Sequence, residues 1–389
     1  MARILLITRN LPPLVGGMER LNWHIADELS RHAEVRMIGP AGSAARRPPR
    51  MELAEVPLHP LWRFLSTSAW RAACIARDWK PDIVLAGSGL TAPAALIAAR
   101  TTGARACAYL HGLDAAVRHP VYRLLWHPAI RCMDTIIANS LPTARLASEL
   151  GVMESRLRIV HPGTHWPDTP QPAHALRAFR ERHGLGDGRF LLSIGRLTSR
   201  KGLREFVEHV LPAVVHAAPD IILAVIGDAP SDSLHASVQT RDSIQAIADA
   251  AGVGRNLRFL GIITDPLELA CAYECAALHI FPVRSIPGDP EGFGMVAIEA
   301  AAHGLPTVAF ATGGIVDAVA NDRSGKLVPP GDYTALRDAI LPMLADQEGA
   351  WRSGCRSFSL DFAWPVFGEK LARALDLDIT PHGTGRALQ

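Results

Sequence analysis

The sequence predicts an α/β protein built from two doubly wound domains. Over most of the 389 residues, short apolar runs alternate with segments of helical periodicity, which is the pattern of parallel sheets covered by helices. The alternation stops once, between residues 163 and 188, and then restarts. The chain is long enough for two hydrophobic cores. In such folds ligands bind at the carboxyl ends of the strands, so we expect the site in a cleft between two facing domains.

The first domain is expected to contain five strands and an early amphipathic helix. The helix starts near Met18, and Leu21, Ile25 and Leu29 keep the spacing of a stripe that faces a core. The apolar runs that predict strands are Ile4–Thr8, Val35–Ile38, Ile83–Ala86, Arg105–Leu110 and Thr135–Ala138.

The second domain is expected to repeat this order after a linker rich in proline, histidine and polar residues. Leu203–Ala217 and Ser243–Ala251 have helical composition. The runs that predict strands are Phe190–Ile194, Ile221–Ile226, Leu257–Leu260, Leu278–Phe281, Thr307–Phe310 and Lys326–Val328.

Charge and cysteine content argue against some classes of protein. With 40 basic and 38 acidic residues the formal net charge is +2, whereas a dedicated nucleic-acid binder normally carries a strong basic excess. The six cysteines form no CxxC pair, and Cys271 and Cys275 are expected to be small buried side chains on one helix face, which indicates a reducing compartment. The amino terminus has no signal-peptide layout, and the apolar stretch Ala92–Ala99 is too short to span a bilayer, so we expect a cytoplasmic protein.

A basic loop flanked by glycines follows the first strand of the second domain. It reads Gly195-Arg196-Leu197-Thr198-Ser199-Arg200-Lys201-Gly202 and opens a helix. A helix N-terminus offers backbone N–H groups and a positive dipole to an anion, and Arg196 and Lys201 add a bidentate fork and a point charge. The loop therefore suits a diphosphate, although a solvated basic turn would look similar. It lacks the Lys-Ser/Thr ending of a P-loop, which argues against an ATPase.

Two carboxylates form the second candidate motif, Glu291-Gly292-Phe293-Gly294-Met295-Val296-Ala297-Ile298-Glu299-Ala300. The glycines allow backbone amides to approach a ligand closely. Glu299 can accept two hydrogen bonds from a diol such as a ribose, and Glu291 in the loop can face a sugar ring. The apolar neighbours of Glu299 indicate that it is partly enclosed, and an enclosed carboxylate needs partners.

Two weaker signals lie in the first domain. Gly16-Gly17 is a turn before the first helix that can pass close to a phosphate, but such turns are common. His111 follows a strand, at the sheet edge where ligand-facing residues emerge in open α/β sheets. A single histidine among sixteen is nevertheless more often structural than catalytic.

Basic and aromatic residues are interleaved in the first domain, as in a segment that contacts anionic lipid head groups. An ordinary, partly exposed helix face would have a similar composition. The segments are Arg46-Arg47-Pro48-Pro49-Arg50, Trp62-Arg63-Phe64 and Trp70-Arg71, followed by Arg118, Tyr122, Arg123, Trp126 and Arg131.

These motifs resemble those of the family 4 glycosyltransferases, and the resemblance extends over nearly the whole chain. Its most specific parts are the E-x7-E pair, Glu291 and Glu299, and the upstream run at 195–202, with support from Gly17 and His111. One motif departs from the family. Where members often read Pro-Asn-Gly-Val-Asp, this chain has His161-Pro162-Gly163-Thr164-His165, and no role is carried over there.

The resemblance implies the GT-B fold, in which two Rossmann-like domains face each other. Residues 1–168 would bind the acceptor and residues 169–361 the donor, and the helix within 362–389 would cross back to the first domain. Arg196 and Lys201 would hold the donor diphosphate. The catalytic residues that the resemblance implies are Glu291, at the transferred sugar, His111, Arg196 and Lys201. Its other donor contacts would be Gly17, Gly195, Ile263, Phe293, Gly294, Met295, Val296 and the ribose ligand Glu299.

The activity implied by the resemblance is retaining transfer of a hexose from a UDP- or GDP-sugar to a hydroxyl of a glycan or lipid-linked acceptor. We expect a role in bacterial envelope polysaccharide or lipopolysaccharide synthesis, with peripheral contact to the inner face of the cytoplasmic membrane. No cofactor and no metal are expected, because the Asp-x-Asp triplet of metal-dependent enzymes occurs here as Asp376-Leu377-Asp378, in the C-terminal tail.

Two other functions remain open. A nucleotide-sugar epimerase of the same architecture would need no acceptor and would scramble the sugar of the donor alone. A non-catalytic scaffold would bind the donor without turnover. An enzyme of the glycogen phosphorylase type would need a lysine-bound pyridoxal phosphate and a longer chain than this one.

Overall fold

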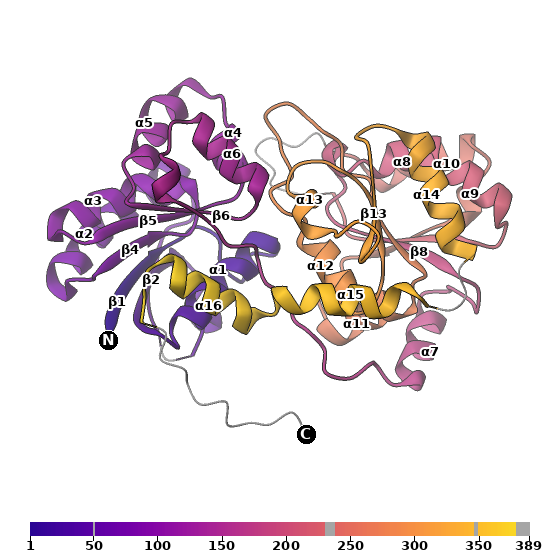
Figure 1. Ribbon diagram of the computed structural model, residues 1–389, viewed down its shortest axis with the longest axis horizontal. Helices are drawn as coiled ribbons and strands as arrows, with labels where there is room; N and C mark the ends of the chain where they lie inside the picture. Colours follow the sequence, from indigo (N-terminus) through magenta and orange to yellow (C-terminus); the bar gives the residue numbers. More distant parts are fainter. Residues whose placement is uncertain (50, 230–237, 346–348, 379–389) are drawn as a thin grey trace. The chain divides into compact units, whose positions relative to one another are not determined.

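The computed structural model describes residues 1–49, 51–229, 238–345 and 349–378. They form two compact units, which Figure 1 colours indigo to magenta with a yellow C-terminal helix for the first, and pink through orange for most of the second. Unit 1 comprises Met1–Gly163 and the segment from Trp364 onwards, and unit 2 comprises Thr164–Ala363. The chain thus enters unit 2 once and returns to unit 1 at its C-terminal end.

Unit 1 contains a parallel sheet of seven strands in the order β3-β2-β1-β4-β5-β6-β7. Its central strands are buried on both faces, which explains why Ile4-Leu5-Leu6-Ile7 is a continuous apolar run rather than an alternating one. The strands are β1 (Ala2–Ile7), β2 (Ala33–Pro40), β3 (Glu52–Val56), β4 (Ile83–Ala86), β5 (Arg105–Leu110), β6 (Thr135–Ala138) and β7 (Leu157–Ile159).

The helices of unit 1 include one from the far end of the chain, α16 (Trp364–Ala374), which packs beside α1 (Gly17–Leu29) (Figure 1). The Trp364 ring stacks on His24 with centroids 3.7 Å apart. A Cβ at Gly163 would come within 2.3 Å of the Trp364 ring, so this glycine allows the contact. The other helices are α2 (Leu61–Trp79), α3 (Ala92–Thr102), α4 (Leu113–Ala116), α5 (Pro120–Arg131) and α6 (Leu141–Glu149), with 3₁₀ turns at Ala44–Arg46, Gly89–Thr91 and Glu154–Arg156.

Unit 2 contains a second parallel sheet, of six strands in the order β10-β9-β8-β11-β12-β13. Its strands are β8 (Phe190–Ile194), β9 (Ile222–Ile226), β10 (Leu257–Gly261), β11 (Leu278–Phe281), β12 (Thr307–Phe310) and β13 (Gly325–Val328). Its helices are α7 (Ala173–Arg182), α8 (Leu203–His209), α9 (Leu211–Ala217), α10 (Arg241–Ala250), α11 (Pro266–Cys275), α12 (Met295–Ala302), α13 (Ile315–Ala318), α14 (Tyr333–Ala345) and α15 (Trp351–Ser359), with 3₁₀ turns at Ser199–Lys201, Gly254–Asn256 and Leu360–Phe362.

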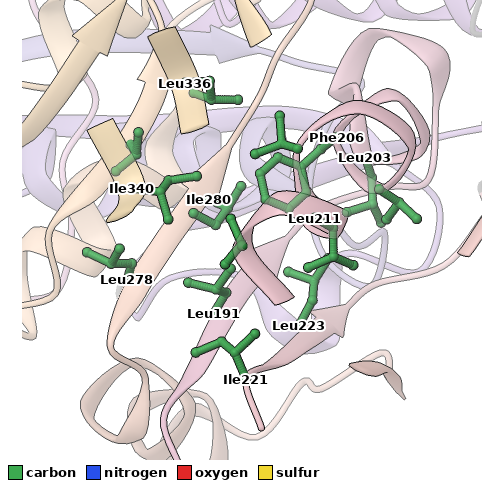
Figure 2. Close-up of a cluster of buried hydrophobic side chains, with 14 of the residues drawn as sticks. Leu191, Leu203, Phe206, Leu211, Ile221, Leu223, Leu278, Ile280, Leu336 and Ile340 are labelled. Carbon is green, nitrogen blue, oxygen red and sulfur yellow. The ribbon is translucent and has the colours of Figure 1, made fainter. Parts of the chain in front are cut away.

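The main core of unit 2 lies between this sheet and its helices. Figure 2 shows strand residues such as Leu191 and Ile280 meeting Phe206 of α8 and Leu336 of α14. All four side chains are removed from solvent. Burial of such apolar surface contributes about 25 cal/mol per Å², so this cluster anchors the strands whose carboxyl ends carry the motif loops.

The predicted fold class is confirmed, since each unit is a parallel sheet flanked by helices. The strands β3 and β7 were not predicted. Both lie at sheet edges and are rich in charged or exposed residues, so they lack the apolar pattern of a buried strand. The expected linker at 163–188 contains helix α7, so it is not irregular throughout. The predicted helix at 203–217 is two helices, because Pro212, in the first turn of α9, has no N–H to continue the ladder of α8.

Among the described helices, none combines the length and the apolarity needed to cross a bilayer.

Candidate active site

Glycines set the loops that follow β8, β9 and β10 in unit 2. Gly195 directly follows β8 with φ +151°, and a Cβ at Gly227 would lie 2.0 Å from the Gly195 carbonyl oxygen. The Gly227 N–H donates to the carbonyl of Gly261, at the end of β10, over 2.8 Å. At the start of α8, Gly202 has φ +69° and would place a Cβ 2.0 Å from the Pro282 oxygen. The carboxyl ends of these strands therefore pack backbone against backbone, which larger residues would prevent.

The basic loop and the first carboxylate meet at these strand ends. Lys201 Nζ donates to Glu291 Oε2 over 2.9 Å, and Arg200 donates to the same oxygen. Arg200 Nε also lies 3.2 Å from Asp289 Oδ1. The Lys201 ammonium sits 4.8 Å from the centroid of the Phe281 ring, as in a cation–π contact. These charged side chains are 11–23% exposed, so the cluster is a largely enclosed pairing of two cations with two carboxylates.

The electrostatics of the cluster keep Glu291 ionised. Burial by itself raises the pKa of this carboxyl, but the nearby charges of Lys201, Arg200 and Arg196 outweigh burial and hold the pKa below its ordinary value. Burial lowers the pKa of the Lys201 ammonium, while Glu291 opposes this shift. The arrangement therefore carries fixed charge at neutral pH and offers no proton donor at Glu291.

The loop that carries Glu291 is held by a second pair of glycines. The Gly314 N–H donates to the Glu291 carbonyl over 2.9 Å, and a Cβ at Gly313 would lie 2.4 Å from that oxygen. Gly294 has φ +93° and immediately precedes α12 as its N-cap residue. The side chain of Phe293 is buried in the core beneath, so Phe293 can meet a ligand through its backbone alone. The N–H groups of Met295 and Val296 belong to the first turn of α12, where such groups lack helix partners.

The second carboxylate, Glu299, lies one turn further along α12 and is 8% exposed. The Tyr273 hydroxyl, from α11, donates to Glu299 Oε2 over 2.8 Å. The partner that an enclosed carboxylate requires is therefore present. Ile263 follows β10 and is half-buried against the core of unit 2, whereas its neighbour Ile262 is 64% exposed.

The remaining two candidates, Gly17 and His111, belong to unit 1. Gly17 begins α1 and is exposed. His111 follows β5 and is buried, with Nε2 2.8 Å from the Gly87 carbonyl. Because a carbonyl only accepts, Nε2 must carry the proton, so in the neutral ring Nδ1 is the nitrogen that can accept a hydrogen bond.

Within unit 2 the structure brings Lys201 and Glu291 into contact, whereas Arg196 is exposed and acts on Glu291 through its charge. Two residues of this site were absent from the prediction. Arg200 adjoins Lys201 in the same basic loop, so its charge alone could have indicated a place in the site. Tyr273 is a buried aromatic residue on a helix, and nothing in the sequence distinguishes it from a core residue.

Two groups of side chains in the described part of the chain resemble metal ligands in composition. His24, Asp27 and Glu28 of α1 have ligand atoms within 4.8 Å of one another, but Arg31 Nε lies 3.2 Å from Glu28 Oε2 and already provides positive charge there. In the Asp-x-Asp triplet, Asp376 accepts from Arg105 over 2.8 Å. Neither group is part of the Lys201–Glu291 cluster.

The basic-aromatic segments divide into exposed and structural residues. On α2, Trp62 and Trp70 are 70% and 66% exposed. On α5, by contrast, Trp126 donates its indole N–H to the Leu90 carbonyl over 2.8 Å and stacks on Tyr122. Exposed apolar side chains of α5 are Val121, Leu124 and Leu125. Arg50 lies outside the described residues.

Two family models match this chain, one over each half. The model described as Glycosyltransferase Family 4 matches residues 15–165, and the model described as Glycosyl transferases group 1 matches residues 188–346. Together with the two parallel sheets, which match GT-B structures, they define a glycosyltransferase of GT-B fold. The chain belongs to the family 4 glycosyltransferases.

Similar proteins include a GDP-mannose-dependent alpha-(1-6)-phosphatidylinositol monomannoside mannosyltransferase of Mycolicibacterium smegmatis, 29% identical over 386 residues, covering 96% of this chain and 98% of that protein. A D-inositol 3-phosphate glycosyltransferase of Xylanimonas cellulosilytica is 31% identical over 268 residues, covering 66% and 59%. Among solved structures, Anabaena HepE in complex with UDP-glucose has a TM-score of 0.79 at 17% identity, covering 97% of this chain and 100% of that one. At this identity the structural likeness shows the fold.

Proposed function

We propose that this protein is a retaining hexosyltransferase that uses a UDP- or GDP-sugar and glycosylates a hydroxyl of a glycan or lipid-linked acceptor in envelope synthesis. The observation that carries the proposal is the enclosed contact of Lys201 and Arg200 with Glu291 at the glycine-rich carboxyl ends of parallel strands. Such strand ends are where ligands bind in open α/β sheets. GDP-mannose is the first donor to test, because the mannosyltransferase similar over nearly the whole chain is named for it.

The proposed role of the basic loop is to hold the donor diphosphate. Lys201 offers a point charge, while the exposed Arg196 offers a planar fork that suits two phosphate oxygens. The first-turn N–H groups of α12 add donors for oxygens of the sugar or the phosphates. Glu299 would accept from the two ribose hydroxyls, and Glu291 would contact hydroxyls of the transferred sugar. For Gly17 and His111 the proposal rests on the family resemblance.

In the proposed reaction the acceptor hydroxyl attacks the anomeric carbon on the face from which the diphosphate leaves. The bond between that carbon and the diphosphate oxygen breaks, and its electron pair stays on the diphosphate. The bond to the acceptor oxygen forms, and a diphosphate oxygen takes the acceptor proton. Lys201 and Arg196 would stabilise the charge that grows on the leaving group, which is the kind of contact that lowers a barrier most. Product with the donor's anomeric configuration is the expected result.

The proposal includes no metal, because the cationic side chains of the basic loop would carry the charge compensation that a divalent ion otherwise supplies. Transfer at an unchanged rate in excess chelator is the expected result. Loss of transfer in chelator, restored by Mg²⁺ or Mn²⁺, would contradict it.

The proposed acceptor is lipid-linked, and the membrane contact would lie on α2. The exposed Trp62 and Trp70 flank the exposed Arg63, a combination that suits an anionic interface. The protein is expected to float with vesicles containing phosphatidylglycerol at moderate salt, and Trp62→Ala combined with Trp70→Ala to weaken flotation. Equal flotation with neutral vesicles, or none with either kind, would contradict the membrane part of the proposal alone.

The decisive experiment is a thermal-shift panel of UDP- and GDP-sugars followed by a transfer assay. A ligand at 100 times its Kd stabilises the native state by about 2.7 kcal/mol, so the donor should raise the melting temperature. Nucleotide release that needs acceptor supports the transferase. Scrambling of the sugar in donor alone would instead indicate an epimerase, and binding without turnover on any acceptor a scaffold.

A further inference from the structure

Glu299 is connected to the start of unit 2 by a chain of side-chain contacts. The hydroxyl of Tyr273 donates to Glu299 Oε2 over 2.8 Å. The Tyr273 ring stacks on His303 with centroids 5.3 Å apart and planes 12° apart. His303 Nδ1 lies 3.0 Å from Glu274 Oε1. The other carboxylate oxygen of Glu274 accepts from the backbone N–H of Gln171 over 2.7 Å, ahead of α7.

Each member of this chain is held in one orientation. Tyr273 is 2% exposed and His303 is 8% exposed, so neither ring has room to turn freely. The end of α12 is anchored as well, because Arg356 donates to the Ala302 carbonyl over 3.0 Å and to the Pro167 carbonyl over 2.9 Å. The hydroxyl that meets Glu299 therefore comes from a rigid support.

We propose that Tyr273 is a positioning residue that fixes the rotation of the Glu299 carboxylate for a ribose diol, and that His303 and Glu274 hold Tyr273 in place. This inference rests on the proposed function, since it assumes that Glu299 binds the ribose of a nucleotide. A carboxylate accepts a diol well in one rotation about its last torsion, and that torsion is intrinsically soft. A hydroxyl donor to a charged oxygen makes a strong hydrogen bond and selects one rotation before the nucleotide arrives.

The test compares ribonucleotides with nucleotides that lack the diol. The Kd of GDP, UDP and their 2′,3′-dideoxy forms is measured by calorimetry for the wild-type protein and for Tyr273→Phe. The substitution should raise the Kd of the bound ribonucleotide by about tenfold. It should leave the Kd of the dideoxy form unchanged, because that ligand makes no diol contact. Unchanged ribonucleotide affinity, or equal weakening of both forms, would overturn the inference, since equal weakening means that Tyr273 supports the fold of the site rather than the carboxylate.

Two further variants keep the result interpretable. In a Glu299→Ala background, Tyr273→Phe should have no additional effect on ribonucleotide affinity, because the carboxylate that it positions is gone. His303→Leu removes the stacked ring from the other side and should also weaken ribonucleotide binding alone. An effect of Tyr273→Phe that persists without Glu299 would overturn the inference.

A matched control removes a buried tyrosine hydroxyl elsewhere. Tyr109 of unit 1 donates to the Val160 carbonyl over 2.6 Å, and Tyr109→Phe should not change nucleotide affinity.

Failure of the proposed function is visible without any variant. If the wild-type protein binds neither GDP nor UDP, or binds the ribo and dideoxy forms equally, the ribose assignment of Glu299 falls and this inference with it. If the wild type discriminates and Tyr273→Phe discriminates equally well, the inference on Tyr273 alone falls.

Discussion

The Lys201 ammonium, one of the two cations proposed to hold a diphosphate, already pairs with a carboxylate, because it shares the acceptor Glu291 Oε2 with the Arg200 guanidinium. We expect Lys201→Ala to lower the turnover of sugar transfer by about 10²–10³-fold, the effect of removing one preorganised contact to a charge that develops in the transition state. Steady-state kinetics with saturating donor measure this. Arg204→Ala provides the control, since Arg204 is an exposed cation on the following helix. Equal turnover in Lys201→Ala and Arg204→Ala would refute the diphosphate assignment.

Removing the charge of Glu291 should separate binding of the nucleotide from transfer. In Glu291→Gln, Lys201 loses its anionic partner and Arg200 keeps only Asp289, so free GDP or UDP is expected to bind more tightly than to the wild-type protein. Transfer should nevertheless fall, because the proposed contact with the sugar is weakened. Calorimetry with the nucleoside diphosphate and kinetics with the full donor give the two readouts. Weaker binding of the free nucleotide would show that Glu291 does not compete for these cations.

Glu291 also makes stability depend on pH in a defined direction. In the folded protein the pKa of Glu291 lies below its ordinary value of 4.5. The free energy of unfolding that the ion pairs of Glu291 contribute is therefore fully present above pH 4.5 and is lost as the pH falls through the folded pKa. The difference in urea unfolding free energy between the wild-type protein and Glu291→Gln should therefore be constant from pH 7 to about 5 and shrink in more acidic solution. A difference that grew with acidification would contradict the ion-pair explanation.

At the scale of elements, the glycine turns between strands and helices hold the site loops. Gly202 has φ +69° and would place a Cβ 2.0 Å from the Pro282 carbonyl oxygen, whereas Gly252 has φ +75° and open space around it. Gly252→Ala should destabilise by about 1–2 kcal/mol through the left-handed backbone alone. Gly202→Ala should cost at least about 1–3 kcal/mol more, because the loop must move away from β11. Urea denaturation of both variants measures the difference, and equal costs would show that the close approach at Gly202 can relax.

At the scale of the whole molecule, unit 1 is completed by a helix that follows unit 2 in the sequence. Trp364 of α16 is 9% exposed, stacks on His24 and meets Phe367 edge-on. We expect Trp364→Ala to cost about 3–5 kcal/mol and to speed amide hydrogen exchange in the strands of unit 1. Phe358→Ala, on α15 of unit 2, is the matched control and should act on the strands of unit 2. Faster exchange in the wrong unit would contradict this assignment of α16.

The strands with apolar runs could be predicted from the sequence, and six of them, such as Ile83–Ala86 and Leu278–Phe281, agree at both ends. A strand that is buried on both faces must consist mainly of apolar residues. The glycines and polar residues on either side of it indicate where burial ends. The edge strands β3 and β7 lack this constraint, since their partly exposed faces accept the composition of a loop.

The candidate site, too, has a part that the sequence predicts and a part that it does not. Its loops are visible in the sequence because glycines and charges are spaced there at short range, as in Gly195–Gly202 and Glu291–Glu299. By itself the sequence determined the class of fold, the reaction family and these two motifs. Only the tertiary structure decided that Arg200 pairs with Glu291 across 91 residues and Tyr273 with Glu299 across 26. Those pairings depend on which strands are neighbours in the sheet and on which helices cover them. The spacing of residues along the chain does not predict either of these.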